Sequence, residues 1–183
     1  MSDASLITQA ADFAARRHAG QRRKGVAAEP YVNHLLEVAA LLAEATGGSD
    51  AALIAAALLH DTLEDTATEY EELDARFGAD VAALVAAVTD DKSLPKAERK
   101  RRQIENAPGA SPRAKLLKIA DKTSNVRALA VSPPTNWDLA RVADYIDWAE
   151  KVVAGCRGLN PALERAFDAA VTDARAAIAK SAA

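Results

Sequence analysis

Residues 51–59 constrain the fold most, because all nine are alanine, leucine or isoleucine. The spacing predicts a helix from about Asp50 to Thr62 that is apolar all round, and such a helix has to be buried at the centre of a domain. Directly after the apolar run come the ionisable pairs His60-Asp61 and Glu64-Asp65. Buried charge is costly unless it is paired or ligates a metal. The sequence therefore favours a metal site over a surface charge cluster here.

The rest of the chain also favours helices. Half of the residues are apolar but only 4% are aromatic, which suits close-packed helices better than sheets. We expect further helices over residues 6–18, 34–46, 68–78, 80–89, 95–106, 113–130, 137–156 and from 161 to the C-terminus. The spacing of Thr68 and Glu71 indicates a capping box, and Asn160 is the expected cap of the last helix. We predict an all-α bundle of about eight to ten helices without a sheet, in a single domain over residues 1–183.

Several classes of protein are disfavoured by composition. One cysteine, Cys156, excludes an intramolecular disulfide and fits a reducing compartment. There is no secretory signal pattern and no apolar run of about 18 residues, so we expect a cytoplasmic protein without a membrane partner. A net charge of −3 argues against a nucleic-acid partner. The oligomeric state stays open.

Four residues are candidate metal ligands. They are His34, which opens an otherwise apolar helix, the adjacent His60 and Asp61, and Asp121, which ends a buried run. Each residue alone has a plainer explanation, such as a satisfied core histidine or a helix cap. Their occurrence on three apolar helices favours a metal site. Two imidazoles and two carboxylates suit Mn²⁺, Fe²⁺ or Zn²⁺ better than Ca²⁺.

The carboxylates of Glu64 and Asp65 are not among the candidate ligands and are therefore candidate catalytic groups. On a continuous helix, His60 and Glu64 share one face, and Asp61 and Asp65 share the neighbouring face. One of the two later carboxylates is then able to orient or deprotonate an attacking water. We interpret His18, the remaining histidine, as a structural contact at a helix end.

The ordered set His34…His60-Asp61…Asp121 is similar to the pattern of the HD superfamily of metal-dependent phosphohydrolases. Residues 18–24, 30–34, 60–65 and 120–125 resemble the hydrolase domain of Rel/SpoT alarmone enzymes. Residues 88–102 and 141–149 resemble the stand-alone metazoan SpoT homologue and small bacterial alarmone hydrolases. The likeness runs from about Leu6 to Phe167. Leu35 departs from it where the family usually has proline, and Thr123-Ser124 stands where the family has bulkier residues.

The resemblance implies a fold, a reaction and a set of contacts. The fold is an HD-domain bundle, and the reaction is Mn²⁺-dependent release of pyrophosphate from the 3′ position of ppGpp, which leaves GDP. One Mn²⁺ per chain, with Zn²⁺ or Fe²⁺ as alternatives, is held by the four ligands, and the catalytic pair is Glu64 and Asp65. The implied substrate contacts are Arg23 and Lys24 beside the base and ribose, Asn125 at the sugar, and Lys96, Arg141 and Tyr145 at the 5′ phosphates or the base.

Three other functions remain open. The first is an HD phosphohydrolase acting mainly on another nucleotide, such as pppApp or the 2′-phosphate of NADPH. The second is an HD module that binds alarmone without cleaving it, against which the intact Glu64-Asp65 pair argues. The third is a nucleic-acid-binding protein that uses the basic helix around Arg99, against which the net charge argues. We expect Arg99 to Arg102 to form a solvated helix face.

Overall fold

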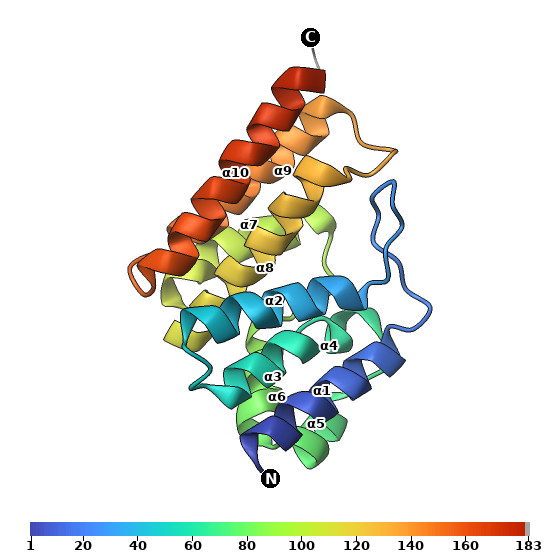
Figure 1. Cartoon of the computed structure of the whole chain (residues 1–183), viewed down its shortest axis with the longest axis vertical. Helices are drawn as coiled ribbons and strands as arrows, with labels where there is room; N and C mark the ends of the chain where they lie inside the picture. The colour runs from blue at the N-terminus through green and yellow to red at the C-terminus, as the bar shows by residue number, and fades with distance from the viewer. Residues whose placement is uncertain (182–183) are drawn as a thin grey trace.

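The structure consists of helices joined by short loops (Figure 1). This computed structural model describes residues 1–181. The helices are α1 (Asp3–Arg17), α2 (Val32–Ala45), α3 (Ala51–Leu59), α4 (Thr62–Asp65), α5 (Tyr70–Phe77), α6 (Ala79–Val88), α7 (Lys96–Asn106), a 3-10 turn (Ala107–Gly109), α8 (Pro112–Val131), α9 (Leu139–Ala154) and α10 (Pro161–Ser181). Within residues 1–181 there is no β-strand, only two isolated bridges. The expected all-α fold is confirmed.

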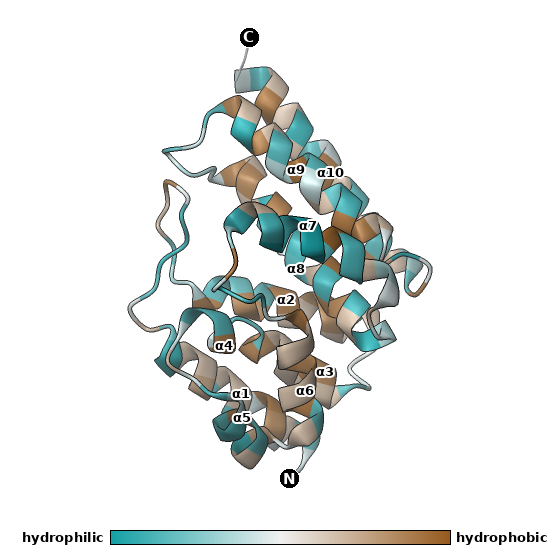
Figure 2. Cartoon of the chain, turned by 180° about the vertical axis from the view of Figure 1, so that it is seen from behind, coloured by the Kyte–Doolittle hydropathy of each residue, from teal (hydrophilic) through white to brown (hydrophobic). Residues whose placement is uncertain are grey.

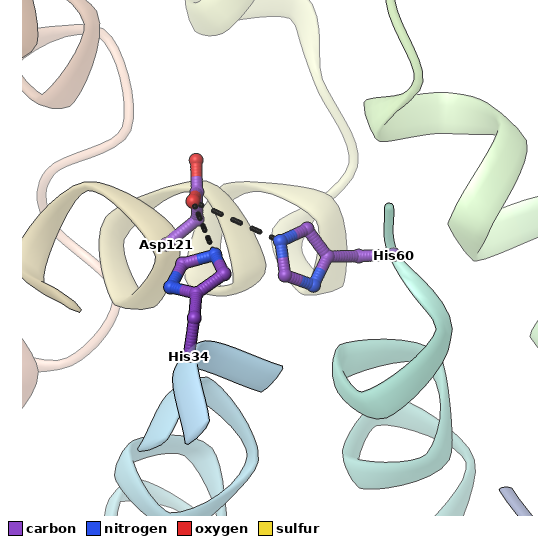
Figure 3. Close-up of side chains that lie close together, drawn as sticks. All are labelled: His34, His60 and Asp121. Atoms are coloured by element: carbon purple, nitrogen blue, oxygen red, sulfur yellow. Dashed lines mark ion pairs between the residues drawn. The ribbon is translucent and has the colours of Figure 1, made fainter. Parts of the chain in front are cut away.

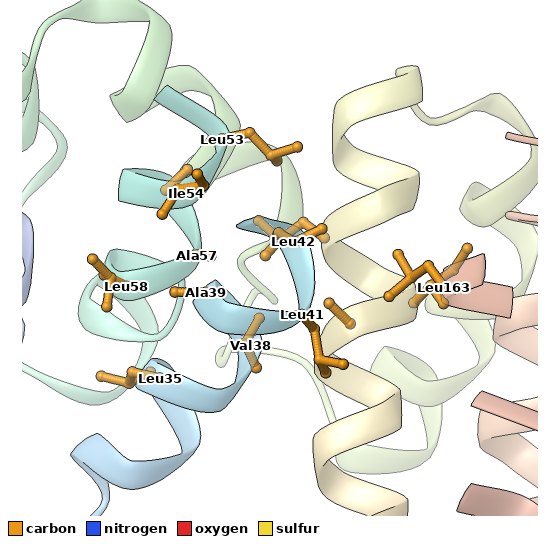
Figure 4. Packing of buried hydrophobic residues seen from close by; sticks show 14 of the residues in the cluster. Leu35, Val38, Ala39, Leu41, Leu42, Leu53, Ile54, Ala57, Leu58 and Leu163 are labelled. Atoms are coloured by element: carbon orange, nitrogen blue, oxygen red, sulfur yellow. The ribbon is translucent and has the colours of Figure 1, made fainter. Parts of the chain in front are cut away.

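Helix α3 lies at the centre of one half of the bundle because its surface carries no polar side chain. Ala52 is its only residue that is not buried. Helices α1, α2, α6 and α8 pack against it, and Figure 4 shows side chains such as Leu42 and Leu53 within the cluster they form. Each fully buried leucine contributes about 1.5–3 kcal/mol relative to an exposed one. This packing fixes the end of α3, where the site begins.

Helix α8 is a second central helix and carries a buried polar stretch. The hydroxyl of Ser111 caps it by accepting a hydrogen bond from the Ala114 amide at 3.3 Å. Helices α2, α9 and α10 pack against it. In its second half Lys122, Thr123 and Ser124 are all buried. Because buried polar groups need partners, this stretch marks a place where α8 does more than fill the core.

The helix expected over residues 50–62 ends early. Helix α3 stops at Leu59, and a turn at His60 and Asp61 separates it from α4. Two side chains satisfy the last carbonyls of α3: His60 Nδ1–H donates to the Ala57 oxygen at 2.7 Å, and Thr62 Oγ1–H donates to the Leu59 oxygen at 2.6 Å. These bonds allow the backbone to leave the helix. The expectation that the ligand pair and the later carboxylate pair share faces of one helix was wrong.

The ends of two other helices test the capping predictions. Thr68 does not cap α5, since the helix begins at Tyr70 after Glu69, which makes no side-chain cap. The Thr68 hydroxyl instead lies 2.7 Å from the Thr66 hydroxyl. Asn160 does cap α10 as expected, because its Oδ1 accepts from the Leu163 amide at 2.9 Å.

Two loops lie side by side at one edge of the bundle (Figure 1). They are the basic loop, residues 18–31, and the α8–α9 loop, residues 132–138. A bridge joins Gly25 to Pro134, and the Ala27 amide donates to Ser132 Oγ at 3.0 Å. Figure 2 shows hydrophilic residues gathered on α5 and α7, whereas α3 and α6 are mostly hydrophobic. No helix within residues 1–181 has the length and apolar character needed to cross a membrane.

Candidate metal centre and adjoining cavity

His34, His60 and Asp121 meet at one point between α2, the end of α3, and α8 (Figure 3). The distance from Asp121 Oδ1 is 3.3 Å to His34 Nε2 and 3.7 Å to His60 Nε2. One donor atom from each of the three residues lies within 4.8 Å of the others. Two ligands that each lie about 2.1 Å from one ion are at most about 4.2 Å apart, so both measured distances fit a shared ion.

Asp61, the fourth predicted ligand, lies beside this cluster. Its Oδ2 is 3.2 Å from His60 Nε2 and 3.6 Å from His34 Nε2. The hydroxyl of Tyr31 donates to the same oxygen at 2.6 Å. Adjacent residues on a regular helix point about 100° apart, so the turn after α3 is what brings His60 and Asp61 to one point. The predicted donors, two imidazoles and two carboxylates, are therefore neighbours.

Both histidines present Nε2 to the cluster because Nδ1 is already occupied. The Nδ1 of His60 is bonded to the Ala57 oxygen, and the Nδ1 of His34 lies 2.8 Å from Ser124 Oγ. His60 Nε2 is buried and has no hydrogen-bond partner among the described residues. A buried imidazole nitrogen that faces carboxylates and lacks a hydrogen-bond partner suits a divalent cation between them. These residues therefore fit a metal ion.

The surroundings keep the carboxylates ionised. Burial of Asp121 opposes ionisation, but the Lys122 ammonium, 2.7 Å away, and the two histidines hold its pKa well below the ordinary value. Burial of Asp61 is likewise outweighed, chiefly by His60, and the pKa of Asp61 is lowered. Ionised carboxylates are the form that ligates a cation.

The Glu64 carboxylate borders the metal cluster directly. It lines a small polar pocket of about 160 Å³ together with three of the predicted ligands, His60, Asp61 and Asp121. Burial raises the pKa of Glu64, while the Asp90 amide, which donates to Glu64 Oε2 at 3.3 Å, works in the opposite direction. A carboxylate with a raised pKa is better suited to accept a proton near neutral pH.

Asp65 faces a different space. It lines a larger cavity, where it accepts a hydrogen bond from Gln21 Nε2 at 2.9 Å and pairs with the ammonium of Lys92. Gln21 is held in turn by His18, whose Nδ1 lies 2.6 Å from Gln21 Oε1. His18 stands at the C-cap of α1, as expected of a helix-end contact, and its ring also stacks on Tyr31 with centroids 5.1 Å apart.

The larger cavity has a volume of about 660 Å³ and adjoins the small pocket. The two spaces share Tyr31, Asp90, Gln103 and Asn125. Of the predicted substrate-binding residues, the cavity is lined by Arg23, Lys24, Lys96, Asn125 and Tyr145. Arg141 is not part of that lining. Its guanidinium instead lies over the ring of Trp137, 4.7 Å from the centroid, and Trp137 lines the cavity.

The expected solvated face of α7 divides in two. Arg101 and Arg102 are exposed and pair with Glu98. Arg99 and Lys100 instead line the cavity, and Arg99 lies 3.5 Å from the Glu64 carboxylate. The expectation was therefore wrong for these two residues. Helical spacing was the available signal, because residues 96, 99, 100 and 103 follow the i, i+3, i+4, i+7 pattern of one face, and all four line the cavity.

Sequence reasoning found Tyr145 but missed the other aromatic residues of the lining. Both tryptophans, Trp137 and Trp148, and Tyr31 also border the cavity. Lys100 Nζ lies 4.7 Å from the Trp148 ring centroid, a cation–π distance. The scarcity of aromatic residues was the signal, because a chain that builds its core from Ala and Leu has little packing need for tryptophan.

Comparison with known proteins places these residues in a family. A model of the HD domain matches residues 10–149. Guanosine-3′,5′-bis(diphosphate) 3′-pyrophosphohydrolase MESH1 of Xenopus tropicalis is 52% identical over 167 residues, which cover 91% of this chain and 93% of that protein. The Homo sapiens protein of the same name is 51% identical over 166 residues, with the same coverage. The solved structure of a metazoan orthologue of SpoT that hydrolyses ppGpp superposes with a TM-score of 0.88 at 46% identity, covering 91% of this chain and 94% of that one. The resemblance drawn from the motifs is confirmed.

Proposed function

Because the chain belongs to the HD domain family and is similar over most of its length to ppGpp pyrophosphohydrolases, we propose that it hydrolyses ppGpp to GDP and pyrophosphate. One observation carries the proposal: the cluster of two histidines and two carboxylates opens beside a cavity lined by cations and aromatic rings. A nucleotide that carries two diphosphates needs both the aromatic rings and the cations of this cavity. The base can stack on aromatic rings, and the phosphates require positive charge.

The metal is the next part of the proposal. The mixed donor set of His34, His60, Asp61 and Asp121 supports one Mn²⁺ per chain, with Zn²⁺ and Fe²⁺ as the alternatives. A divalent ion bound there supplies Lewis-acid chemistry, since it neutralises phosphate charge and makes water more acidic. The low pKa values of Asp61 and Asp121 support their role as ionised ligands.

Glu64 is our candidate for the base that takes a proton from the attacking water. Its place in the pocket of the ligands and its raised pKa both support this role. The water oxygen joins the phosphorus that bears the 3′ ester, and the sugar 3′ oxygen leaves with the bonding electron pair and takes up a proton. Asp65, tied to Gln21 and Lys92, holds these two side chains at the edge of the substrate cavity.

The charges around the cavity support an anionic substrate. Burial lowers the pKa of Lys96, and the nearby charges of Arg141, Lys24 and Arg99 lower it further. Burial lowers the pKa of Lys100 as well, and Lys96 adds to the effect. Positive side chains that repel one another in this way are stabilised when an anion binds between them. Arg23 is already oriented, because its Nη2 donates to Asn125 Oδ1 at 3.1 Å.

The test compares turnover of ppGpp, pppApp and NADPH by the purified chain at equal concentration, measured as pyrophosphate release from ppGpp and pppApp and as phosphate release from NADPH. We expect ppGpp to be turned over fastest with Mn²⁺, and EDTA to abolish turnover. Faster turnover of pppApp or NADPH would assign the site to that nucleotide. Binding of ppGpp without pyrophosphate release at saturating Mn²⁺ would contradict the proposal and favour a binding module.

A further inference from the structure

His34 is oriented by side chains, whereas His60 is oriented by backbone. His34 Nδ1 lies 2.8 Å from Ser124 Oγ, and Ser124 Oγ donates a hydrogen bond of 2.6 Å to Glu37 Oε2. Arg127 Nη1 donates to the other oxygen of Glu37 at 3.1 Å. His34 and Ser124 are buried, while the Glu37 side chain reaches the cavity wall. Nothing in the catalytic scheme above uses Ser124 or Glu37.

The direction of these bonds follows from the chemistry of the groups. An ionised carboxylate only accepts hydrogen bonds, so Glu37 takes the single proton of the Ser124 hydroxyl. The hydroxyl oxygen can then only accept from His34, which places the imidazole proton on Nδ1. The lone pair is left on Nε2, the atom 3.3 Å from Asp121 Oδ1. We call the hydrogen-bonded chain of His34, Ser124 and Glu37 the relay. It selects the His34 tautomer that metal binding requires.

The spacing in the sequence explains why ligand and support occur together. Glu37 follows His34 by three residues on α2, and Ser124 follows Asp121 by three residues on α8. Residues three apart on a helix share a face, so the facing surfaces of α2 and α8 each carry one ligand and one supporting group. The small side chain of Ser124 leaves room for Glu37 to reach it, and the Ser124 Oγ to Glu37 Oε2 distance is 2.6 Å.

We propose that Ser124 and Glu37 are positioning residues that fix the tautomer and ring orientation of His34 for metal binding. This inference rests on the metal site of the proposed function. Outer partners of ligating histidines typically change metal affinity by about 10- to 100-fold when they are removed. A network that only joined α2 to α8 would change stability and leave metal affinity unchanged.

The experiment measures Mn²⁺ affinity directly, by competition with a chromophoric chelator and without nucleotide. We expect Ser124→Ala to weaken Mn²⁺ binding by about 10- to 100-fold. Thr123→Ala is the matched control, because Thr123 is equally buried on α8 but its hydroxyl donates to the Ile119 oxygen at 2.7 Å. That control should lose stability and keep the wild-type affinity.

Glu37→Gln keeps the test decisive if Ser124→Ala does not fold. The amide can donate to Ser124 and free the hydroxyl proton for His34 Nδ1, so we expect weaker Mn²⁺ binding and a changed tautomer. Nitrogen-15 NMR of the imidazole should show His34 protonated at Nδ1 in the metal-free wild type and not in this variant. Wild-type affinity in folded Ser124→Ala, or an unchanged tautomer and affinity in Glu37→Gln, overturns the proposal. A wild-type chain that binds no Mn²⁺ instead contradicts the proposed metal site itself.

Discussion

Replacing Gly25 with alanine should displace the basic loop from the cavity. A Cβ at this position would lie 2.1 Å from the Ser132 carbonyl oxygen and 2.4 Å from its hydroxyl. Real Cβ atoms essentially never come closer than 3.0 Å, so the loop has to move by about 1 Å. The first of these clashes is with backbone, which cannot rotate away. The contact that holds the loop, Ala27 N–H to Ser132 Oγ at 3.0 Å, lies within the same region.

The expected magnitude follows from what the loop carries. Arg23 and Lys24 precede Gly25 and line the cavity. Loss of one hydrogen bond between a charged side chain and a phosphate costs about 1.5–3 kcal/mol, which corresponds to about 10- to 100-fold in kcat/KM. The candidate metal ligands and Glu64 lie on other elements, so we expect the loss to appear mainly in KM for ppGpp rather than in kcat.

Gly20→Ala is the matched control, because a Cβ there meets no atom within 4 Å. Both variants are compared by steady-state pyrophosphate release over a range of ppGpp concentrations, with the thermal midpoint as a check on folding. We expect Gly20→Ala to retain the wild-type KM. A wild-type KM in folded Gly25→Ala would refute the reasoning, since the loop would then not need its place against the α8–α9 loop.

Three further predictions concern the carboxylates and α7. Burial raises the pKa of Glu64, and the ionised form is the base, so kcat/KM should fall as the pH drops through that raised pKa. The Lys92 charge lowers this pKa, so Lys92→Ala should move the acid limb of the pH profile to higher pH. Asp65→Asn should retain Mn²⁺, measured by metal analysis, and lose turnover; loss of the ion would assign Asp65 to the ligand shell. Arg99→Ala should lower kcat/KM for ppGpp by at least about tenfold, whereas Arg102→Ala, on the exposed face of the same helix, should leave it unchanged.

The candidate ligand set could be predicted from the sequence because buried charge stands out in an apolar run. An apolar run such as residues 51–59 can only be a core helix, and a histidine and carboxylates at its end need a reason to be there. The turn at His60 and Asp61 could not be predicted from the sequence in the same way. It depends on the His60 and Thr62 side chains bonding to the carbonyls of Ala57 and Leu59, a tertiary detail that the local helix propensity of the run does not reveal.

The Ser124–Glu37 relay could not be predicted from the sequence for a different reason. Ser124 and Glu37 are 87 residues apart, and only the contact between α2 and α8 brings them together. A buried serine in a helix has many ordinary explanations, among them a bond to its own backbone, as Thr123 makes to Ile119. Sequence indicates such a partner only when the pairing of helix faces is known.

The distribution of ion pairs explains how a chain of net charge −3 can serve an anionic substrate. Several arginines away from the cavity are neutralised, since Arg113, Arg157 and Arg175 each pair with two carboxylates. Lys24 and Lys100, which line the cavity, have no salt bridge among residues 1–181. Paired charges largely cancel beyond a Debye length of about 8 Å at physiological ionic strength, so the field that reaches solvent comes from the unpaired ones. Unpaired cations therefore line the cavity although the whole molecule is acidic, and net charge alone could not have revealed their placement.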